Sequence, residues 1–143
     1  MMNLMAEQQF SYKQVDNWNI HEIVDLYKAA GWWKDSYEAS HLPLLMKGSF
    51  IFVLAVDNKT EKAVGMGRVI SDGISDGYIQ DVVVLPAYRK KGIGKAIIKE
   101  LITFCQSKGV NWVALISEPG QSDFYKPLGF NIMKQYVPMK YEM

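Results

Sequence analysis

The feature that most limits the possible folds is the segment DVVVLPAYRKKGIGK (residues 81–95), in which an apolar run meets a basic, glycine-containing connection. Three consecutive valines are typical of a strand buried on both faces, and Pro86 ends that strand. From Gly92 to about residue 108, apolar residues recur at helical spacing, and Gly109 follows as a C-cap. A buried strand therefore leads directly into a long amphipathic helix, which needs a sheet to cover.

The remaining apolar patterns predict further elements on both sides of this segment. Alternating or β-branched runs predict strands at residues 10–15, 50–56, 63–70, 78–85 and 112–116, and a closing hairpin of residues 130–133 and 137–141. Helical signals predict a helix from Asn19 to Gly31, a broken helix within residues 32–48 and a short helix at residues 121–128. The order is β-α-α-β-β-β-α-β-α-β-β, which predicts a mixed α/β sheet in one domain, residues 1–143.

Composition argues against several classes of protein. A formal net charge of +1 disfavours a broad basic surface for nucleic acid. Cys105 is the only cysteine, and with His21 and His41 alone to help it a structural zinc site is not expected, so we expect no metal. No apolar run approaches the roughly 20 residues of a membrane span, and residues 1–9 lack the pattern of a secretory signal. We expect a cytoplasmic protein that binds neither nucleic acid nor membrane.

The connection before the long helix has the features of an anion site. A helix N-terminus presents unpaired N–H groups and the positive end of the helix dipole, and Gly92 and Gly94 allow close approach to the backbone. A solvated basic surface beside a tight turn is the alternative. A P-loop is excluded because Arg89 takes the place of its first glycine, and a dinucleotide fingerprint is excluded because Ile97 takes the place of its third small residue.

Two motifs resemble those of the GNAT superfamily of acyl-CoA-dependent N-acetyltransferases. RKKGIG (residues 89–94) matches every position of its coenzyme A signature, Q/R-x-x-G-x-G/A, and FYKPLGF (residues 124–130) is similar to its aromatic-Tyr-x-x-x-Gly-Phe segment. The resemblance covers residues 10–141 apart from the variable region 32–48. It implies an α+β GNAT fold with a mixed, mostly antiparallel sheet of about six to seven strands and about four helices. In that fold the strand ending near Val84 and the strand of residues 112–116 splay apart.

The resemblance also implies that acetyl-CoA is the acyl donor. Its pantetheine arm would hydrogen-bond the Val82 to Val84 backbone as an added strand, and an N–H near Val83 would stabilise the oxyanion formed during attack on the thioester. Tyr125 takes the place of the general acid for the leaving thiolate, with a purely structural core tyrosine as the alternative. The implied cofactor-binding residues are Val82, Val83, Val84, Arg89, Lys90, Lys91, Gly92, Ile93, Gly94 and Lys95.

The acceptor amine must lose a proton, because an alkylammonium of pKa ~10.4 is neutral in only about one molecule in a thousand at pH 7. Asp81 and Glu118 are candidates for the base or for a contact with the substrate charge, and each could instead cap a turn. Some relatives carry an Asn that contacts the cofactor near the place of Glu118, and this chain departs from them. Trp32, Trp33 and Tyr37 lie where the family walls its acceptor pocket, so they predict either an aromatic amine site or a small satellite core.

We therefore expect an acyltransferase that acetylates a primary amine by direct attack on the thioester. Near-neutral charge favours a small-molecule acceptor. A protein or peptide N-acetyltransferase and a non-catalytic CoA-binding regulatory module are the alternatives. Cys105 lies on the apolar stripe of the long helix and is expected to be buried, while His21 and His41 are expected at the surface. The expected partners are acetyl-CoA and a small amine, and a homodimer is left open.

Overall fold

The computed structural model describes residues 8–143, and these form one sheet of five strands in the order β1-β2-β3-β4-β5. All neighbouring strands are antiparallel except β4 and β5, which are parallel. The strands are β1 (Phe10–Gln14), β2 (Ile51–Asp57), β3 (Lys62–Ser71), β4 (Asp76–Val84) and β5 (Trp112–Ala114). The helices are α1 (Ile20–Ala29), α2 (Leu42–Gly48), α3 (Ile93–Ser107) and α4 (Ser122–Tyr125), with 3-10 turns η2 (Ala39–His41), η3 (Pro86–Tyr88) and η4 (Lys126–Leu128).

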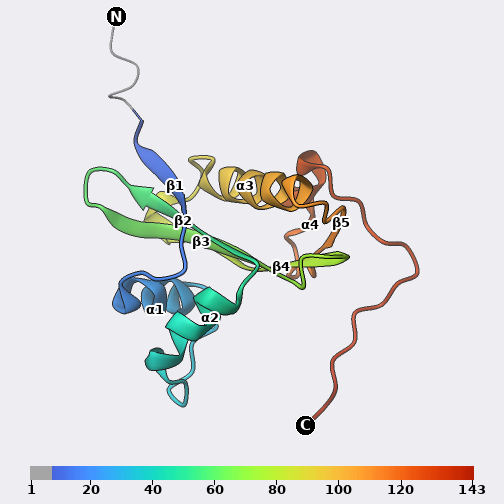
Figure 1. The fold of residues 1–143 in the computed structure, drawn as a ribbon, viewed down its shortest axis with the longest axis horizontal. Coiled ribbons are helices and arrows are strands. Elements are labelled where there is room, and N and C mark those ends of the chain that lie inside the picture. The colour runs from blue at the N-terminus through green and yellow to red at the C-terminus, as the bar shows by residue number, and fades with distance from the viewer. Residues whose placement is uncertain (1–7) are drawn as a thin grey trace, which may run out of the picture.

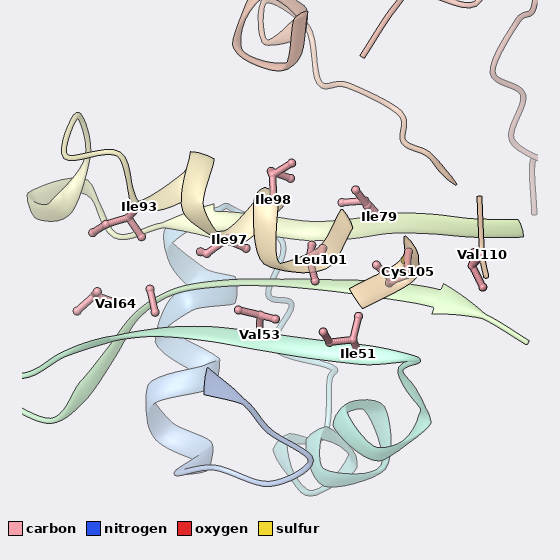
Figure 2. Packing of buried hydrophobic residues seen from close by; sticks show 12 residues of the cluster. Ile51, Val53, Val64, Ile79, Ile93, Ile97, Ile98, Leu101, Cys105 and Val110 are labelled. Atoms are coloured by element: carbon pink, nitrogen blue, oxygen red, sulfur yellow. The ribbon is translucent and has the colours of Figure 1, made fainter. Parts of the chain in front are cut away.

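Helices cover both faces of this sheet, α3 on one face and α1 with α2 on the other (Figure 1). Strand β2 is buried throughout because its alternate side chains serve the two layers. Val53 faces α3, and Figure 2 shows Ile97 and Leu101 of that helix in the same cluster. Phe52 and Leu54 face α1 and α2. The α/β prediction is therefore confirmed, with a core on each side of one sheet.

Local sequence signals explain where the two main helices begin and end. The Asn19 side chain accepts a hydrogen bond from the Glu22 N–H and caps α1, and Gly31 follows that helix with a φ of 78°. Helix α3 begins after Gly92 (φ 82°) and is followed by Gly109 (φ 78°). Both glycines adopt the left-handed region, which other residues enter only with strain.

Helix α3 approaches β3 closely because β3 has glycines at the contact. A Cβ atom at Gly67 would lie 2.8 Å from Ile97 Cγ2. We expect Gly67→Ala to destabilise the fold by about 1–3 kcal/mol through overpacking. Thermal melting would measure the loss. Gly48→Ala is the matched control, because a Cβ at Gly48 meets no atom within 4 Å, and a melting temperature for Gly67→Ala equal to that of the control would contradict this packing.

The predicted number of strands was wrong. Residues 130–143, all within the described part of the chain, form no strand, so the closing hairpin of residues 130–133 and 137–141 is absent and the sheet has five strands instead of six or seven. A two-stranded hairpin has little stability unless it packs on another surface. Strand β5 is also shorter than predicted and ends at Ala114. Residues 1–7, most of the stretch expected to lack a secretory signal, lie outside the described residues.

Each of the two less regular helical regions has a proline in its first turn or at an internal break. Within residues 32–48, the helical part is confined to η2 and α2, and Pro43 lies in the first turn of α2, where its missing N–H costs nothing. The helix predicted at residues 121–128 divides into α4 and η4, with Pro127 in η4 and Gly129 at the end. None of the helices in residues 8–143 is long and apolar enough to cross a membrane.

Candidate active site

Strands β4 and β5 are paired over only a short distance. Asp76, Gly77 and Tyr78 of β4 pair with the three residues of β5, and β4 then continues to Val84 without β5 beside it. One set of main-chain groups in the second half of β4 is thus left without a β5 partner. An extended ligand with amide groups can bind there as an added strand. The predicted separation of these two strands agrees with this pairing.

A β-bulge interrupts β4 at this point. Met66 pairs with Val83 and Arg68 with Gln80, so Asp81 and Val82 together lie opposite the single residue Gly67. Asp81 has a φ of 59°, a conformation that is uncommon for residues other than glycine. Strained residues of this kind gather at functional sites because the surrounding structure holds them in place.

Asp81 is held by two partners on the α1 side of the sheet. The Tyr27 hydroxyl of α1 donates a hydrogen bond to Asp81 Oδ2 over 2.7 Å, and Arg68 Nε of β3 donates to the same oxygen, also over 2.7 Å. Burial, and after it the Asp81 charge, raises the pKa of Tyr27 far above its ordinary value. Tyr27 therefore remains a neutral donor at physiological pH, and Asp81 has one fixed orientation.

A pocket of about 390 Å³ opens beside Asp81. Its walls come from α1, the segment between α1 and η2, η2 itself, α2 and β4. The lining residues are Tyr27, Trp32, Trp33, Ser36, Tyr37, Glu38, His41, Leu42, Leu45 and Asp81. Trp33 packs edge-to-face on Tyr37 at 5.5 Å between ring centroids. The three predicted aromatic residues and Asp81 therefore share one pocket.

Glu118, which follows β5, forms a hydrogen bond with one of the pocket residues. Trp32 Nε1 donates a hydrogen bond to Glu118 Oε1 over 3.1 Å, although the two residues are 86 positions apart. Glu118 also acts on Tyr125, because burial first and the Glu118 charge second raise the pKa of the Tyr125 phenol. Tyr125 packs edge-to-face on Phe124 and Phe130. Glu118 is thus linked to the aromatic pocket by a hydrogen bond from Trp32 and acts on the predicted general acid through its charge.

The predicted anion segment is an exposed loop that leads into α3. Lys90 and Gly92 have φ values of 63° and 82°, and Arg89 Nε donates to the Val84 carbonyl over 3.1 Å. Within the described chain, no side chain caps the N-terminus of α3, so its first N–H groups are available to a ligand. The basic side chains are all exposed, at Arg89, Lys90, Lys91 and Lys95.

Two members of this segment lie deeper than the rest. Ile93 is buried in the α3 core, so only its main chain could contact a cofactor. A Cβ at Gly94 would lie 3.1 Å from Phe124 Cζ, which brings the second motif onto the start of α3. Val82 and Val84 pack toward α3, and Val83 packs toward α1. The two motifs, 30 residues apart in sequence, therefore meet in space.

The cysteine and the two histidines differ in burial and in their distance from the pocket. Cys105 is fully buried, as expected, and burial raises the pKa of its thiol. His21 is exposed away from the pocket, whereas His41 is exposed and lines it. Sequence reasoning missed Tyr27 and Arg68. Tyr27 had only the pattern of a helix core residue, but Arg68, a charge inside an otherwise apolar strand, was a signal that could have been used.

The second half of β4 has no β5 partner, and it leads through an exposed basic loop to the uncapped N-terminus of α3. The sequence profile of the "Acetyltransferase (GNAT) family" matches residues 12–130. The chain is 31% identical over 114 residues to "Uncharacterized N-acetyltransferase ycf52" of Pyropia yezoensis, covering 80% of this chain and 66% of that protein. The chain therefore belongs to the GNAT acetyltransferase family, and the predicted family and acyltransferase class are confirmed.

Two further comparisons agree with this assignment. The chain is 44% identical over 72 residues to "GCN5-related N-acetyltransferase 1, chloroplastic" of Arabidopsis thaliana, covering 50% of this chain and 36% of that protein. A GNAT family acetyltransferase of Streptococcus pneumoniae, SP0256, is similar in structure with a TM-score of 0.76 and 28% identity, covering 94% of this chain and 98% of that one. The chain thus spans between about a third and two thirds of these two curated relatives.

Proposed function

We propose that this chain transfers the acetyl group of acetyl-CoA to the primary amine of a small molecule. The observation that carries the proposal is the aromatic pocket, which has the fixed carboxylate Asp81 in its wall, on the strand whose far end has no β5 partner. A pocket of a few hundred Å³ with few polar groups suits a small ligand. The exposed carboxylate of Glu38 adds negative charge, which favours a cationic amine.

The donor would bind along β4 and at the start of α3. The pyrophosphate would accept hydrogen bonds from the first N–H groups of α3, and the basic loop would neutralise its charge. The Tyr88 hydroxyl donates to Asp57 Oδ2 over 2.8 Å and so holds η3, just before the loop, against the end of β2. The pantetheine amides would pair with the main chain of residues 82–84, with the acetyl carbonyl near the N–H of Val83.

In the proposed reaction a C–N bond forms and a C–S bond breaks. The amine nitrogen attacks the acetyl carbon, and the resulting oxyanion is stabilised by main-chain N–H donors. Collapse of this intermediate breaks the C–S bond, and the coenzyme A thiolate accepts a proton from Tyr125. The ammonium loses one proton to Glu118 before the attack, and Glu118 releases it to solvent. The second proton, lost by the nitrogen after the attack, returns Tyr125 to its neutral form through solvent or Glu118. No covalent enzyme intermediate and no metal are needed for this balance.

The contacts of Asp81 and Glu118 suggest different roles for them. Asp81 already forms an ion pair with Arg68 and accepts from Tyr27, so it is better suited to orient the ammonium than to remove its proton. The Glu118 carboxylate accepts one hydrogen bond, from Trp32, and its charge acts on Tyr125. We assign the deprotonation of the amine to Glu118, directly or through a water molecule.

Acetylation of a panel of small amines, followed by release of the free coenzyme A thiol, tests the proposal. We expect thiol release with at least one aromatic or aliphatic primary amine, and an acetylated product by mass spectrometry. A histone-type peptide in the same panel tests for a protein acceptor. Thiol release with peptides alone would overturn the small-molecule acceptor, and tight acetyl-CoA binding without turnover would indicate a regulatory module.

A cytoplasmic location also stays a prediction.

We expect Trp32→Ala and Trp33→Ala each to raise the KM for the acceptor while leaving the KM for acetyl-CoA nearly unchanged. A contact between an ammonium and a ring face contributes roughly 0.5–2 kcal/mol, which corresponds to a roughly two- to thirtyfold change. Steady-state kinetics with each substrate varied in turn would measure it.

Trp18→Ala is the matched control, because Trp18 packs on the same core but lines no part of the aromatic pocket. Thermal melting of all three variants separates lost packing from lost binding. If the Trp32 and Trp33 variants melt early but keep wild-type acceptor kinetics when folded, the two rings form a satellite core and the pocket is not the acceptor site.

A further inference from the structure

Tyr27 and Arg68 form a polar cluster with Asp81 in the wall of the aromatic pocket. The side chain of Arg68 is only 14% exposed, and its Nε atom donates to Asp81 Oδ2 over 2.7 Å. The Tyr27 hydroxyl donates to the same oxygen, also over 2.7 Å. A nearly buried ion pair adds little to stability by itself. What the two donors do determine is the place and orientation of the Asp81 carboxylate.

The two donors occupy one oxygen of Asp81 and leave the other. Within the described residues, both hydrogen bonds reach Oδ2 and none reaches Oδ1. The Asp81 side chain is 20% exposed and lines the pocket, so Oδ1 is the oxygen that a ligand in the pocket can use. A carboxylate oxygen only accepts hydrogen bonds, whereas an ammonium donates up to three. The vacant side of Asp81 is therefore complementary to a cationic amine.

Arg68 also connects Asp81 to another wall of the pocket. Its Nη1 atom donates to Ser49 Oγ over 3.4 Å, and the Ser49 hydroxyl donates to the Leu45 carbonyl over 2.8 Å. Leu45 belongs to α2 and lines the pocket. The planar guanidinium thus reaches Asp81 with one nitrogen and the end of α2 with another. The single ammonium of a lysine has no such fork.

Tyr27 makes the corresponding connection on α1. Its ring is buried and packs on Trp32 and Trp33, with 6.3 and 6.4 Å between the ring centroids. Its hydroxyl is the part that reaches Asp81. One side chain therefore contacts both the aromatic wall and the carboxylate. Replacement of Tyr27 by Phe keeps the first contact and removes only the second.

We propose that Tyr27 and Arg68 are positioning residues, which fix Asp81 so that its Oδ1 atom selects a cationic acceptor over a neutral one. This inference rests on the proposed function, and it adds the charge of the acceptor and the residues that select it. No lysine or arginine lines the pocket in the part of the chain that the structure describes, so no cation of the pocket lining opposes the ammonium. The other titratable lining residues are Tyr37, Glu38 and His41.

Calorimetric titration of the full chain with benzylamine and with benzyl alcohol tests this proposal. The two probes share a ring, but only benzylamine carries an ammonium at about pH 7. We expect the wild type to bind benzylamine roughly ten- to hundredfold more tightly than benzyl alcohol, the effect of a hydrogen bond to a charged group. Tyr27→Phe should bind benzylamine roughly two- to tenfold more weakly, the effect of one neutral hydrogen bond, and benzyl alcohol as before.

Tyr12→Phe is the matched control, because it removes a phenol hydroxyl on the α3 side of the sheet, away from the pocket. It should bind both probes as the wild type does. Circular dichroism and thermal melting check that each variant folds.

A double variant separates positioning from packing. Asp81→Asn should lose the preference for benzylamine, and addition of Tyr27→Phe to it should cause little further loss, because the hydroxyl acts through the carboxylate. A structural effect of Tyr27 that is independent of Asp81 would instead add to the first loss.

Two variants of Arg68 separate positioning from charge. If Arg68 acted only through its positive charge, its removal would strengthen the binding of a cation. We expect the opposite, weaker benzylamine binding in Arg68→Met, with part of the affinity recovered in Arg68→Lys.

Equal affinity of the wild type for the two probes, additive losses in the double variant, or tighter benzylamine binding by Arg68→Met would each overturn the proposal. Acetylation of amines by the wild type, together with unchanged benzylamine binding by Tyr27→Phe, would overturn this inference alone. Selective benzylamine binding without thiol release from any amine would overturn the proposed function alone.

Discussion

Gly92→Val should bind no measurable acetyl-CoA while the protein remains folded. Gly92 has a φ of 82° at the start of α3, and a Cβ there would meet no protein atom within 4 Å, so the new side chain would enter the space that the pyrophosphate needs. A valine in the left-handed region costs roughly 1–2 kcal/mol, which a domain with about 5–15 kcal/mol of stability tolerates. Calorimetric titration with acetyl-CoA measures the loss.

Gly109→Val is a closely matched control for this backbone strain. Gly109 follows the other end of α3, has a φ of 78° and likewise has no atom within 4 Å of an added Cβ. Both variants should show a similar decrease in melting temperature, but only Gly92→Val should lose acetyl-CoA binding. If a folded Gly92→Val protein binds acetyl-CoA with wild-type affinity, the pyrophosphate does not bind at this loop.

Tyr125→Phe should lower kcat by roughly 10² to 10⁴ with little change in acetyl-CoA affinity, because the variant loses the proposed proton donor and keeps the ring. Phe124 and Phe130 pack edge-to-face on the Tyr125 ring, which the variant keeps, so the fold should be preserved. Burial and the Glu118 charge raise the pKa of Tyr125 above its ordinary value of 10.0. The phenol therefore stays protonated as pH rises through neutrality, and its loss should be felt across the whole physiological range.

Tyr12→Phe is the matched control, because it removes a phenol hydroxyl outside the proposed site. Tyr12 lies on β1, at the opposite edge of the sheet from β5, and burial raises its pKa as well. Its kcat should equal that of the wild type. If Tyr125→Phe also keeps the wild-type kcat, Tyr125 is a structural tyrosine and a CoA-binding module without turnover becomes the better explanation.

The local parts of this fold could be predicted because their signals lie within a few residues of one another. Helix α3 follows from the spacing of Ile93, Ile97, Leu101 and Cys105 between two glycines, and the structure agrees to within a residue or two. Strands β2 and β3 follow from apolar runs joined by turn-forming residues. The two motifs needed only their own residues to indicate the GNAT family.

The C-terminal hairpin could not be decided in the same way. Residues 137–141 alternate as a strand should, but a strand also needs a partner with unpaired main-chain groups and an apolar face. Periodicity does not say whether that partner is available in the same chain. Residues 137–141 have the alternating pattern of a strand, but they pair with no strand in the described part of the chain, and their apolar side chains are exposed.

The sequence by itself determined the main helices, the central strands and the family. Only the tertiary structure brought Tyr27 and Arg68 onto one oxygen of Asp81, because these residues lie on α1, β3 and β4, which meet only in the folded protein. The same holds for Trp32 and Glu118, which lie in the segments after α1 and after β5. The bulge that positions Asp81 depends on the register of β3 against β4, which pattern within one strand does not reveal. Periodicity records which face of an element is apolar, whereas the contacts of a polar side chain depend on how whole elements are placed against one another.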